Sequence, residues 1–423
     1  MSRRHLLSSV GIQGLGAAAT FAVGLAIAVW QGPQAQGHYG LVRTAADLVV
    51  ALALFGLPQS MVHGLNQRGA SAASLERISW RYAAILLACV VVACAAFAAF
   101  AAVPMGGVDG HALGGSSRPW WLGALLLGSV GWTLQGLLRV LALARGSAVQ
   151  FAWQSVTPSL TLLASVAALL AAGSQRFELA LAASGVASVL LAAWQLRPLR
   201  AQTGWRQGAA STLASLAVDG THAFAQSATI ALQPWLTLLL LRDQGASVAE
   251  VGQFVFAAYV FQAFSLPTSF VAPLLFARVS AATGAGLPYA TRAIIGRVLG
   301  WTAAASLCFA LLLPLAVPAL FGMVFAPAVG ACVLLALAGP LLVANRLGVS
   351  VLFGRGRFRA ASAHAVLRAA AVPLCLWLVW SLTGIDRVTG AGLAWLLTEA
   401  VCLLALVALW RRSSDQPANE RVA

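Results

Sequence analysis

Apolar segments follow one another through almost the whole chain. Each is roughly 20 residues long, enough to cross the ~30 Å hydrocarbon layer of a bilayer as a helix. Of the 423 residues, 60% are hydrophobic and 9% are charged, whereas soluble domains carry about 25% charged residues. Because backbone groups inside hydrocarbon must be paired within the segment itself, these segments are predicted to be α-helices. The sequence therefore predicts an all-α polytopic membrane protein.

Twelve membrane spans can be counted. Their bounds are 7–30, 40–62, 80–103, 119–138, 150–172, 178–196, 214–241, 252–276, 293–313, 317–343, 360–382 and 388–410. The termini and alternate connections hold 20 arginines, while the other connections hold only Arg118, Arg176, Arg242 and Arg387. Since arginine collects on the cytoplasmic side of membrane proteins, both termini are predicted to be cytoplasmic.

A repeated pattern indicates an internal duplication. Gly37-His38-Tyr39 returns about half a chain later as Gly252-Gln253-Phe254, and Leu57-Pro58-Gln59-Ser60-Met61-Val62 returns at a similar separation as Leu266-Pro267-Thr268-Ser269-Phe270-Val271. Six spans precede the loop around Arg197–Arg206 and six follow it. The predicted units are residues 1–205 and 206–423, two parallel six-helix bundles related by an axis along the membrane normal. Transporters with such repeats bind their substrates between the two units.

Several function classes are excluded by the same observations. The net charge of +15 follows from the arginines of the connections, so it does not predict nucleic-acid binding. The six cysteines all lie in spans without short spacings, and neither a metal site nor a disulfide framework is predicted. No phosphate-binding Walker motif is present, and connections of at most about 20 residues leave no room for a catalytic domain. We expect neither an enzyme nor a bound cofactor or metal.

Short motifs near the span boundaries resemble a known superfamily. They are Gly32-Pro33 and Gly37-His38-Tyr39, Val251-Gly252-Gln253-Phe254 with Ala257-Ala258, Pro273, and Leu320-Phe321-Gly322-Met323-Val324-Phe325-Ala326-Pro327-Ala328. The chain is similar to the superfamily of Wzx-type lipid-linked oligosaccharide flippases, polysaccharide transporters and multidrug and toxin extruders (MATE). The resemblance implies a bacterial inner-membrane protein with a MATE-like central cavity, opening alternately to either side and lined largely by spans 1, 2, 7 and 8.

Polar residues within those spans are the candidate substrate-binding groups. Arg43 and Asp47 are spaced i,i+4 and can pair on one helix face, either as a structural pair or as a site for a phosphate group on Arg43. Asp219, His222, Gln226 and Gln233 share one face of the seventh span, with a solvated helix end as the alternative for Asp219. Gln262 of the eighth span completes the set through the resemblance.

Ion coupling has two candidates, Glu399 and Asp219, with H⁺ or Na⁺ as the ion. Glu399 lies near the middle of the last span, where a charge costs ~2.5–3.5 kcal/mol on insertion scales. It is either a protonated carboxyl bonded to a neighbouring helix or a proton-coupling group. His364 and Arg368, at the start of the eleventh span, are predicted to reach toward the cytoplasmic surface.

The resemblance implies a flippase that moves an undecaprenyl-pyrophosphate-linked oligosaccharide to the periplasmic leaflet for polysaccharide or lipopolysaccharide synthesis. Its partners would be the glycolipid, the bilayer, and a polymerase and glycosyltransferases. A cation-coupled multidrug exporter is the main alternative, favoured by a small, aromatic and acidic cavity. A membrane glycosyltransferase would need a large outer loop that this chain lacks. A non-transporting scaffold of a polysaccharide assembly complex is the remaining alternative.

Overall fold

The computed structural model describes residues 3–56, 118–144, 148–174, 176–202, 211–281 and 289–414, with a few positions between 88 and 95. The described residues form helices joined by short connections, without a β-strand among them. The predicted all-α class is therefore confirmed. The third span, 80–103, lies outside the described residues except for those few positions, and the motif at 57–62 lies wholly outside them.

The first two predicted spans form one continuous element, α1 (Arg3–Leu54), which is interrupted at Gly32. Gly32 has φ 76°, a conformation that glycine adopts without strain, and Pro33 then begins the second half, residues 33–54. Thr20 and Asp47 line one pocket, although a straight helix would hold them about 40 Å apart. The chain therefore reverses at Gly32, and α1 supplies two antiparallel spans.

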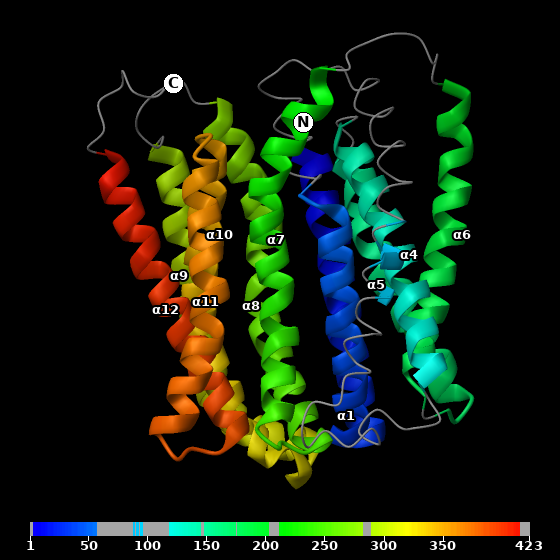
Figure 1. Cartoon of the computed structure of the whole chain (residues 1–423), viewed down its shortest axis with the longest axis vertical. Helices are drawn as coiled ribbons and strands as arrows, with labels where there is room; N and C mark the ends of the chain where they lie inside the picture. Colours follow the sequence, from blue (N-terminus) through cyan, green and yellow to red (C-terminus); the bar gives the residue numbers. More distant parts are fainter. Residues whose placement is uncertain are drawn as a thin grey trace.

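Three helices pack with α1 on one side of the bundle: α4 (Arg118–Ala144), α5 (Ala148–Ala171) and α6 (Glu178–Gln202) (Figure 1). At the crossing of α4 and α6, a Cβ on Gly131 would overlap the backbone of Gly185, and a Cβ on Gly185 would overlap the carbonyl of Leu127. Glycine at such crossings lets transmembrane helices approach closely.

The rest of the bundle begins with α7 (Ser211–Asp243) and α8 (Val248–Ala281), which lie beside α1 in the middle of the molecule (Figure 1). A capping box fixes the start of α8: the Ser247 amide donates to the Glu250 carboxylate (2.7 Å), and the Glu250 amide donates to the Ser247 hydroxyl (3.2 Å). The separation in residue number between Gly37 and Gly252 is called here the repeat offset. Val248 follows Pro33 by this same offset, so α8 and the second half of α1 begin at equivalent positions.

The far side of the bundle holds α9 (Tyr289–Phe321), the short 3₁₀ helix η2 (Met323–Ala328), α10 (Val329–Gly354), α11 (Phe358–Leu382) and α12 (Arg387–Ser414) (Figure 1). The predicted tenth span, 317–343, is wrong at both ends. Gly322 has φ 77° and ends α9, so the tenth span begins after η2 and continues to Gly354. Arg346, one of the arginines assigned to a cytoplasmic connection, consequently lies inside α10.

Buried apolar side chains form two main clusters. One joins α1, α4, α5 and α6, and the other joins the helices from α7 to α12. The predicted boundary between units, at 205/206, falls among residues 203–210, outside the described residues. It stays a prediction.

Nine helices in the described part are long and apolar enough to cross a membrane, and one of them is α1, which doubles back. α6 adds a shorter apolar stretch, 179–195. Large apolar side chains such as Trp301 and Leu315 of α9 are 78% and 76% exposed, as expected of a surface that faces lipid. The chain is a multi-pass membrane protein. α1 begins and α12 ends at one end of the bundle, and the connections 244–247 and 383–386 lie at the opposite end, called here the distal end (Figure 1).

Candidate functional site

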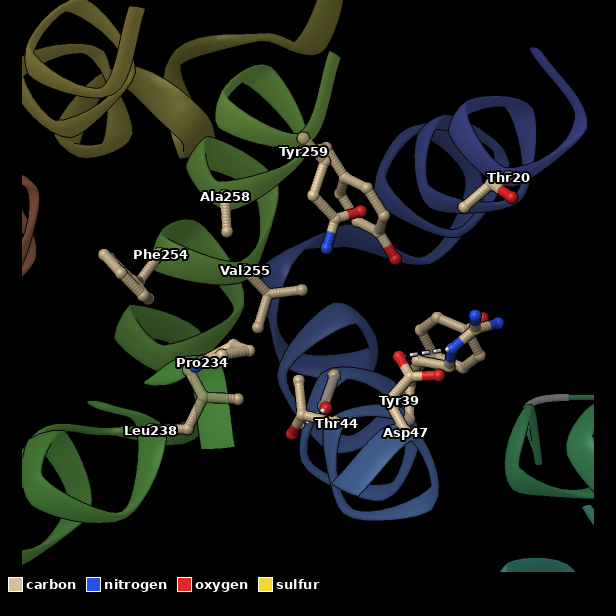
Figure 2. Close-up of a pocket in the computed structure, with 13 residues that line it drawn as sticks. Thr20, Tyr39, Thr44, Asp47, Pro234, Leu238, Phe254, Val255, Ala258 and Tyr259 are labelled. Atoms are coloured by element: carbon tan, nitrogen blue, oxygen red, sulfur yellow. Dashed lines mark hydrogen bonds and ion pairs between the residues drawn. The ribbon is translucent and has the colours of Figure 1, made fainter. Parts of the chain in front are cut away.

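A pocket lies where α1 meets α7 and α8 (Figure 2). It contains about 510 Å³ of empty space, part of it open to solvent. The first half of α1 contributes Thr20 and α7 contributes Pro234 and Leu238. The second half of α1 and α8 contribute the remaining residues: Tyr39, Gly40, Arg43, Thr44, Asp47, Phe254, Val255, Ala258, Tyr259 and Gln262.

The two walls of this pocket are built from equivalent positions of the repeat. Every residue that the second half of α1 contributes has a partner, one repeat offset later, that also lines the pocket. The pairs are Tyr39 and Phe254, Gly40 and Val255, Arg43 and Ala258, Thr44 and Tyr259, and Asp47 and Gln262. The repeat read from short motifs thus extends along the second half of α1 and α8, whereas Thr20, Pro234 and Leu238 have no such partner in the pocket. The walls differ in charge, because Arg43 and Asp47 face Ala258 and Gln262.

The charged wall carries an ion pair that is still open to the pocket. Arg43 Nε donates to Asp47 Oδ2 at 3.0 Å, and their side chains are 22% and 42% exposed. The Arg43 guanidinium also lies over the ring of Trp132 on α4, 4.1 Å from its centroid. Stacking and pairing hold the arginine in place, whereas Asp47 is held by one of its two carboxylate oxygens. The carboxylate is therefore the more accessible of the two charges.

Aromatic side chains form much of the remaining surface. Tyr39 and Tyr259 have their rings almost fully buried, and Phe254 is buried between the pocket and the ring of Trp395. Gly24 makes room for Tyr259, since a Cβ at that position would be 2.5 Å from the nearest ring atom. Figure 2 shows Tyr259 projecting from α8 toward α1. The pocket is thus apolar and aromatic on most sides, with one polar edge.

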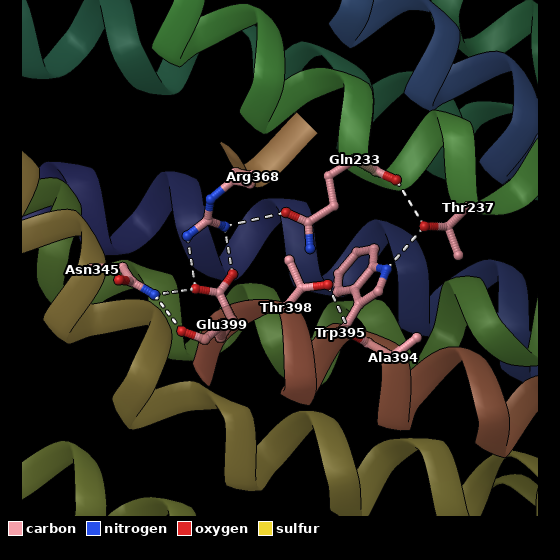
Figure 3. A network of polar contacts seen from close by, with 8 residues as sticks. All are labelled: Gln233, Thr237, Asn345, Arg368, Ala394, Trp395, Thr398 and Glu399. Carbon is pink, nitrogen blue, oxygen red and sulfur yellow. Dashed lines mark hydrogen bonds and ion pairs between the residues drawn. The ribbon is translucent and has the colours of Figure 1, made fainter. Parts of the chain in front are cut away.

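A second polar cluster lies among helices α7, α10, α11 and α12 (Figure 3). Arg368 donates through both terminal nitrogens to Glu399, with the Nη2 to Oε2 distance at 2.7 Å, and Asn345 Nδ2 donates to the same oxygen at 2.7 Å. Gln233 Oε1 accepts from Arg368 at 3.2 Å. All four side chains are at most 4% exposed. The cluster joins four helices by charge-assisted hydrogen bonds.

This cluster corrects two predictions. His364 and Arg368 do not reach toward the surface, since they are 1% and 3% exposed and Arg368 turns inward to Glu399. Glu399 is bonded to neighbouring helices, as the structural alternative required, and its partners are Arg368 and Asn345. Arg368 of α11 and Glu399 of α12 lie at the same level of the bundle, so the arginine side chain reaches the buried carboxylate and not the surface.

The structure separates the predicted substrate-binding residues. Arg43, Asp47 and Gln262 line the pocket, whereas Gln226 is buried away from it and Gln233 belongs to the second cluster. Asp219 and His222 lie in α7, but their side chains lie outside the described part.

Sequence reasoning missed other residues of the two sites. It did not single out Tyr259 or Asn345, and Tyr39 appeared only as part of the repeat motif. The repeat offset, extended beyond that motif, pairs Tyr259 with Thr44 and would have marked both positions. Within the described residues no cluster of His, Cys, Asp and Glu is arranged to hold a metal.

No protein-family model and no curated protein sequence matches this chain. Solved structures of MATE transporters match it in fold. The MATE multidrug transporter DinF-BH has a TM-score of 0.68 at 15% identity, covering 97% of this chain and 94% of that one. An outward-facing MATE family transporter of the MOP superfamily gives 0.68 at 14% identity, covering 99% and 97%. A mutant of the Vibrio cholerae MATE transporter VcmN gives 0.65 at 12% identity, covering 97% and 96%. The chain therefore has the MATE transporter fold over nearly its full length.

Proposed function

We propose that the protein is a membrane transporter that exports small amphipathic molecules, organic cations in particular, through the pocket between the repeats. The observation that carries this proposal is the Asp47 carboxylate, 42% exposed, on the edge of a pocket lined by Tyr39, Tyr259 and Phe254. Aromatic faces and a carboxylate are the groups that bind an organic cation. The fold shared with MATE multidrug transporters supports this proposal over the flippase.

A lipid-linked oligosaccharide flippase is the second candidate, favoured by Arg43. This guanidinium lies in the pocket and could bind a pyrophosphate group if Asp47 were displaced. Such a protein would act in a bacterial inner membrane, with cytoplasmic termini, beside a polymerase and glycosyltransferases. Under this proposal Arg43→Ala abolishes glycan export at normal protein abundance, and Arg43→Lys restores part of it.

Transport in proteoliposomes separates the two candidates. The purified protein is reconstituted with a cationic rhodamine dye as one probe and a fluorescent undecaprenyl-pyrophosphate oligosaccharide as the other, with and without H⁺ or Na⁺ gradients. Dye transport that depends on a gradient and is lost in Asp47→Asn supports the exporter. Glycolipid transport that is lost in Arg43→Ala supports the flippase. Transport of neither probe, with retained binding to polysaccharide-assembly proteins, would support the scaffold.

Coupling to H⁺ or Na⁺ remains part of this proposal, with Glu399 and Asp219 as its candidates. Glu399 is fully buried and bonded to both Arg368 and Asn345, so taking up a proton would break an ion pair. Glu399→Gln and Asp219→Asn are compared in the same proteoliposomes. A flattened gradient response in one variant identifies the coupling group, and a full response in both excludes the two residues.

A further inference from the structure

The two copies of the repeat touch backbone to backbone at a pair of glycines. A Cβ built on Gly37 would overlap the carbonyl oxygen of Val248, and one built on Gly252 would overlap the carbonyl oxygen of Pro33. The same added atoms would lie 3.1 Å from the Gly252 nitrogen and 2.8 Å from the Gly37 nitrogen. Any side chain at either position would therefore force the helices apart.

This contact is reciprocal. Gly37 and Gly252 are separated by the repeat offset, and so are Pro33 and Val248, so each copy presents the same two positions to the other. A contact in which residue i meets j and j meets i is the mark of a twofold interface. One turn further along, Gly40 packs against its own repeat partner, Val255. The pseudo-twofold axis of the repeat thus runs through the crossing of the second half of α1 with α8.

The crossing lies between the pocket and the distal end. Tyr39 and Phe254, which line the pocket, follow the two glycines by two positions, about 3 Å along each helix. Val248 begins α8 directly after the distal connection 244–247. Toward the opposite end, Phe55, which directly follows α1, stacks on Phe224 of α7 with ring centroids 4.5 Å apart.

We propose that the Gly37–Gly252 crossing is the closed distal gate of the transport pathway. It rests on the proposed transport function. Because neither glycine has a side chain, the two backbones meet on the repeat axis. This contact closes the distal side of the pocket. Opening the pocket to the distal side requires the two glycines to separate. A methyl group on either glycine favours the separated state.

The gate is tested by the accessibility of the pocket. Gln262→Cys places a thiol on an exposed pocket position, and its reaction with a membrane-impermeant maleimide is timed from each face of the membrane. The chain without this substitution, with its six native cysteines, gives the background rate. Gln262→Cys alone is called here the parent. Gly37→Ala and Gly252→Ala are expected to raise labelling from the distal face about tenfold, equivalent to about 1.4 kcal/mol between the two states. Gly300→Ala, whose Cβ meets nothing within 4 Å, is the matched control and keeps the parent rate.

A milder pair of variants keeps the test decisive if the first two do not fold. The Cβ of Gly40→Ala meets side-chain atoms of Val255, so we expect a smaller increase in distal labelling. Adding Val255→Ala removes the two nearest of those atoms and should return the rate to that of the parent. Distal labelling at the parent rate in every folded glycine variant overturns the gate, even if dye transport is intact. Increased distal labelling in a protein that transports neither probe overturns the proposed function and leaves the gate standing.

Discussion

Two arginine–carboxylate pairs in the described part of the bundle lie away from the helix ends, and they differ in exposure and in the helices that they join. Arg43 and Asp47 are neighbours on one helix, 22% and 42% exposed, in contact with a pocket. Arg368 and Glu399 come from different helices, are 3% and 0% exposed, and are surrounded by Gln233 and Asn345. The first pair keeps groups available to a ligand, whereas the second uses its hydrogen bonds to join helices.

The difference shows that an intramembrane charge is not by itself a marker of a substrate site. Both pairs are costly to insert into a membrane. From sequence alone Glu399 is the stronger candidate for a functional group, because it lies nearer the middle of its span. The exposure of the side chains reverses this ranking, because a ligand can reach only the more exposed pair, Arg43 and Asp47. Changes at the buried pair should therefore alter stability first, and changes at the pocket pair should alter transport first.

Removing the charge of Glu399 should have the largest effect. Glu399→Gln leaves Arg368 buried and unpaired, so we expect the free energy of unfolding to fall by about 3–5 kcal/mol. Chemical unfolding in detergent measures this. The double variant Arg368→Met/Glu399→Leu should recover most of the loss, since an apolar pair of similar size leaves no charge unpaired. A Glu399→Gln protein as stable as wild type would show that the pair is not a structural element.

Neutralising Asp47 should reverse the pattern. The loss of a charged contact to a cationic ligand is worth about 1.5–3 kcal/mol, so Asp47→Asn should lower the kcat/KM of rhodamine transport about 10- to 100-fold. The free energy of unfolding should change by less than about 1 kcal/mol, because the pair is partly solvated. A stability loss as large as that of Glu399→Gln would mean that both pairs are structural.

A single hydroxyl in the pocket should matter less. Tyr259→Phe keeps the ring that packs against Gly24 and removes one hydrogen-bonding group, worth about 0.5–1.5 kcal/mol. We expect a 2- to 10-fold rise in KM, with kcat and folding unchanged. Thr398→Ala, at a buried threonine outside the pocket, is a control whose KM should not move.

The exposed pair at the distal end should have the smallest effect. Arg387 and Glu250 are 3.9 Å apart and 46% and 34% exposed. Arg387→Ala should change the free energy of unfolding by less than about 1 kcal/mol, and the change should shrink further as salt is added. A larger, salt-independent effect would show that the Arg387 bond to the Gly245 carbonyl holds the connection between α7 and α8.

The spans and the repeat could be predicted because both depend on short stretches of the sequence. Apolar length sets most helix bounds within a few residues, and the Gly37 and Gly252 motifs mark the crossing on the axis. The tenth span was displaced because Pro318 and Gly322 are one helical turn apart and hydropathy does not say which one ends the helix. The partner of Glu399 was missed for a different reason. Arg368 lies on the preceding helix, and only the packing of α11 against α12 decides that its long side chain turns inward.

The reciprocal contact at Gly37 and Gly252 also has a consequence for how a ligand lies in the pocket. A surface that meets its own copy in this way is the surface on which two identical six-helix chains would pair, and such a dimer would have two identical walls around its cavity. Within one chain that constraint does not apply, so one wall carries Arg43 and Asp47 while the other carries Ala258 and Gln262. A ligand with one charged side and one apolar side then has a single way to lie in the pocket. A symmetric dimer would offer it two.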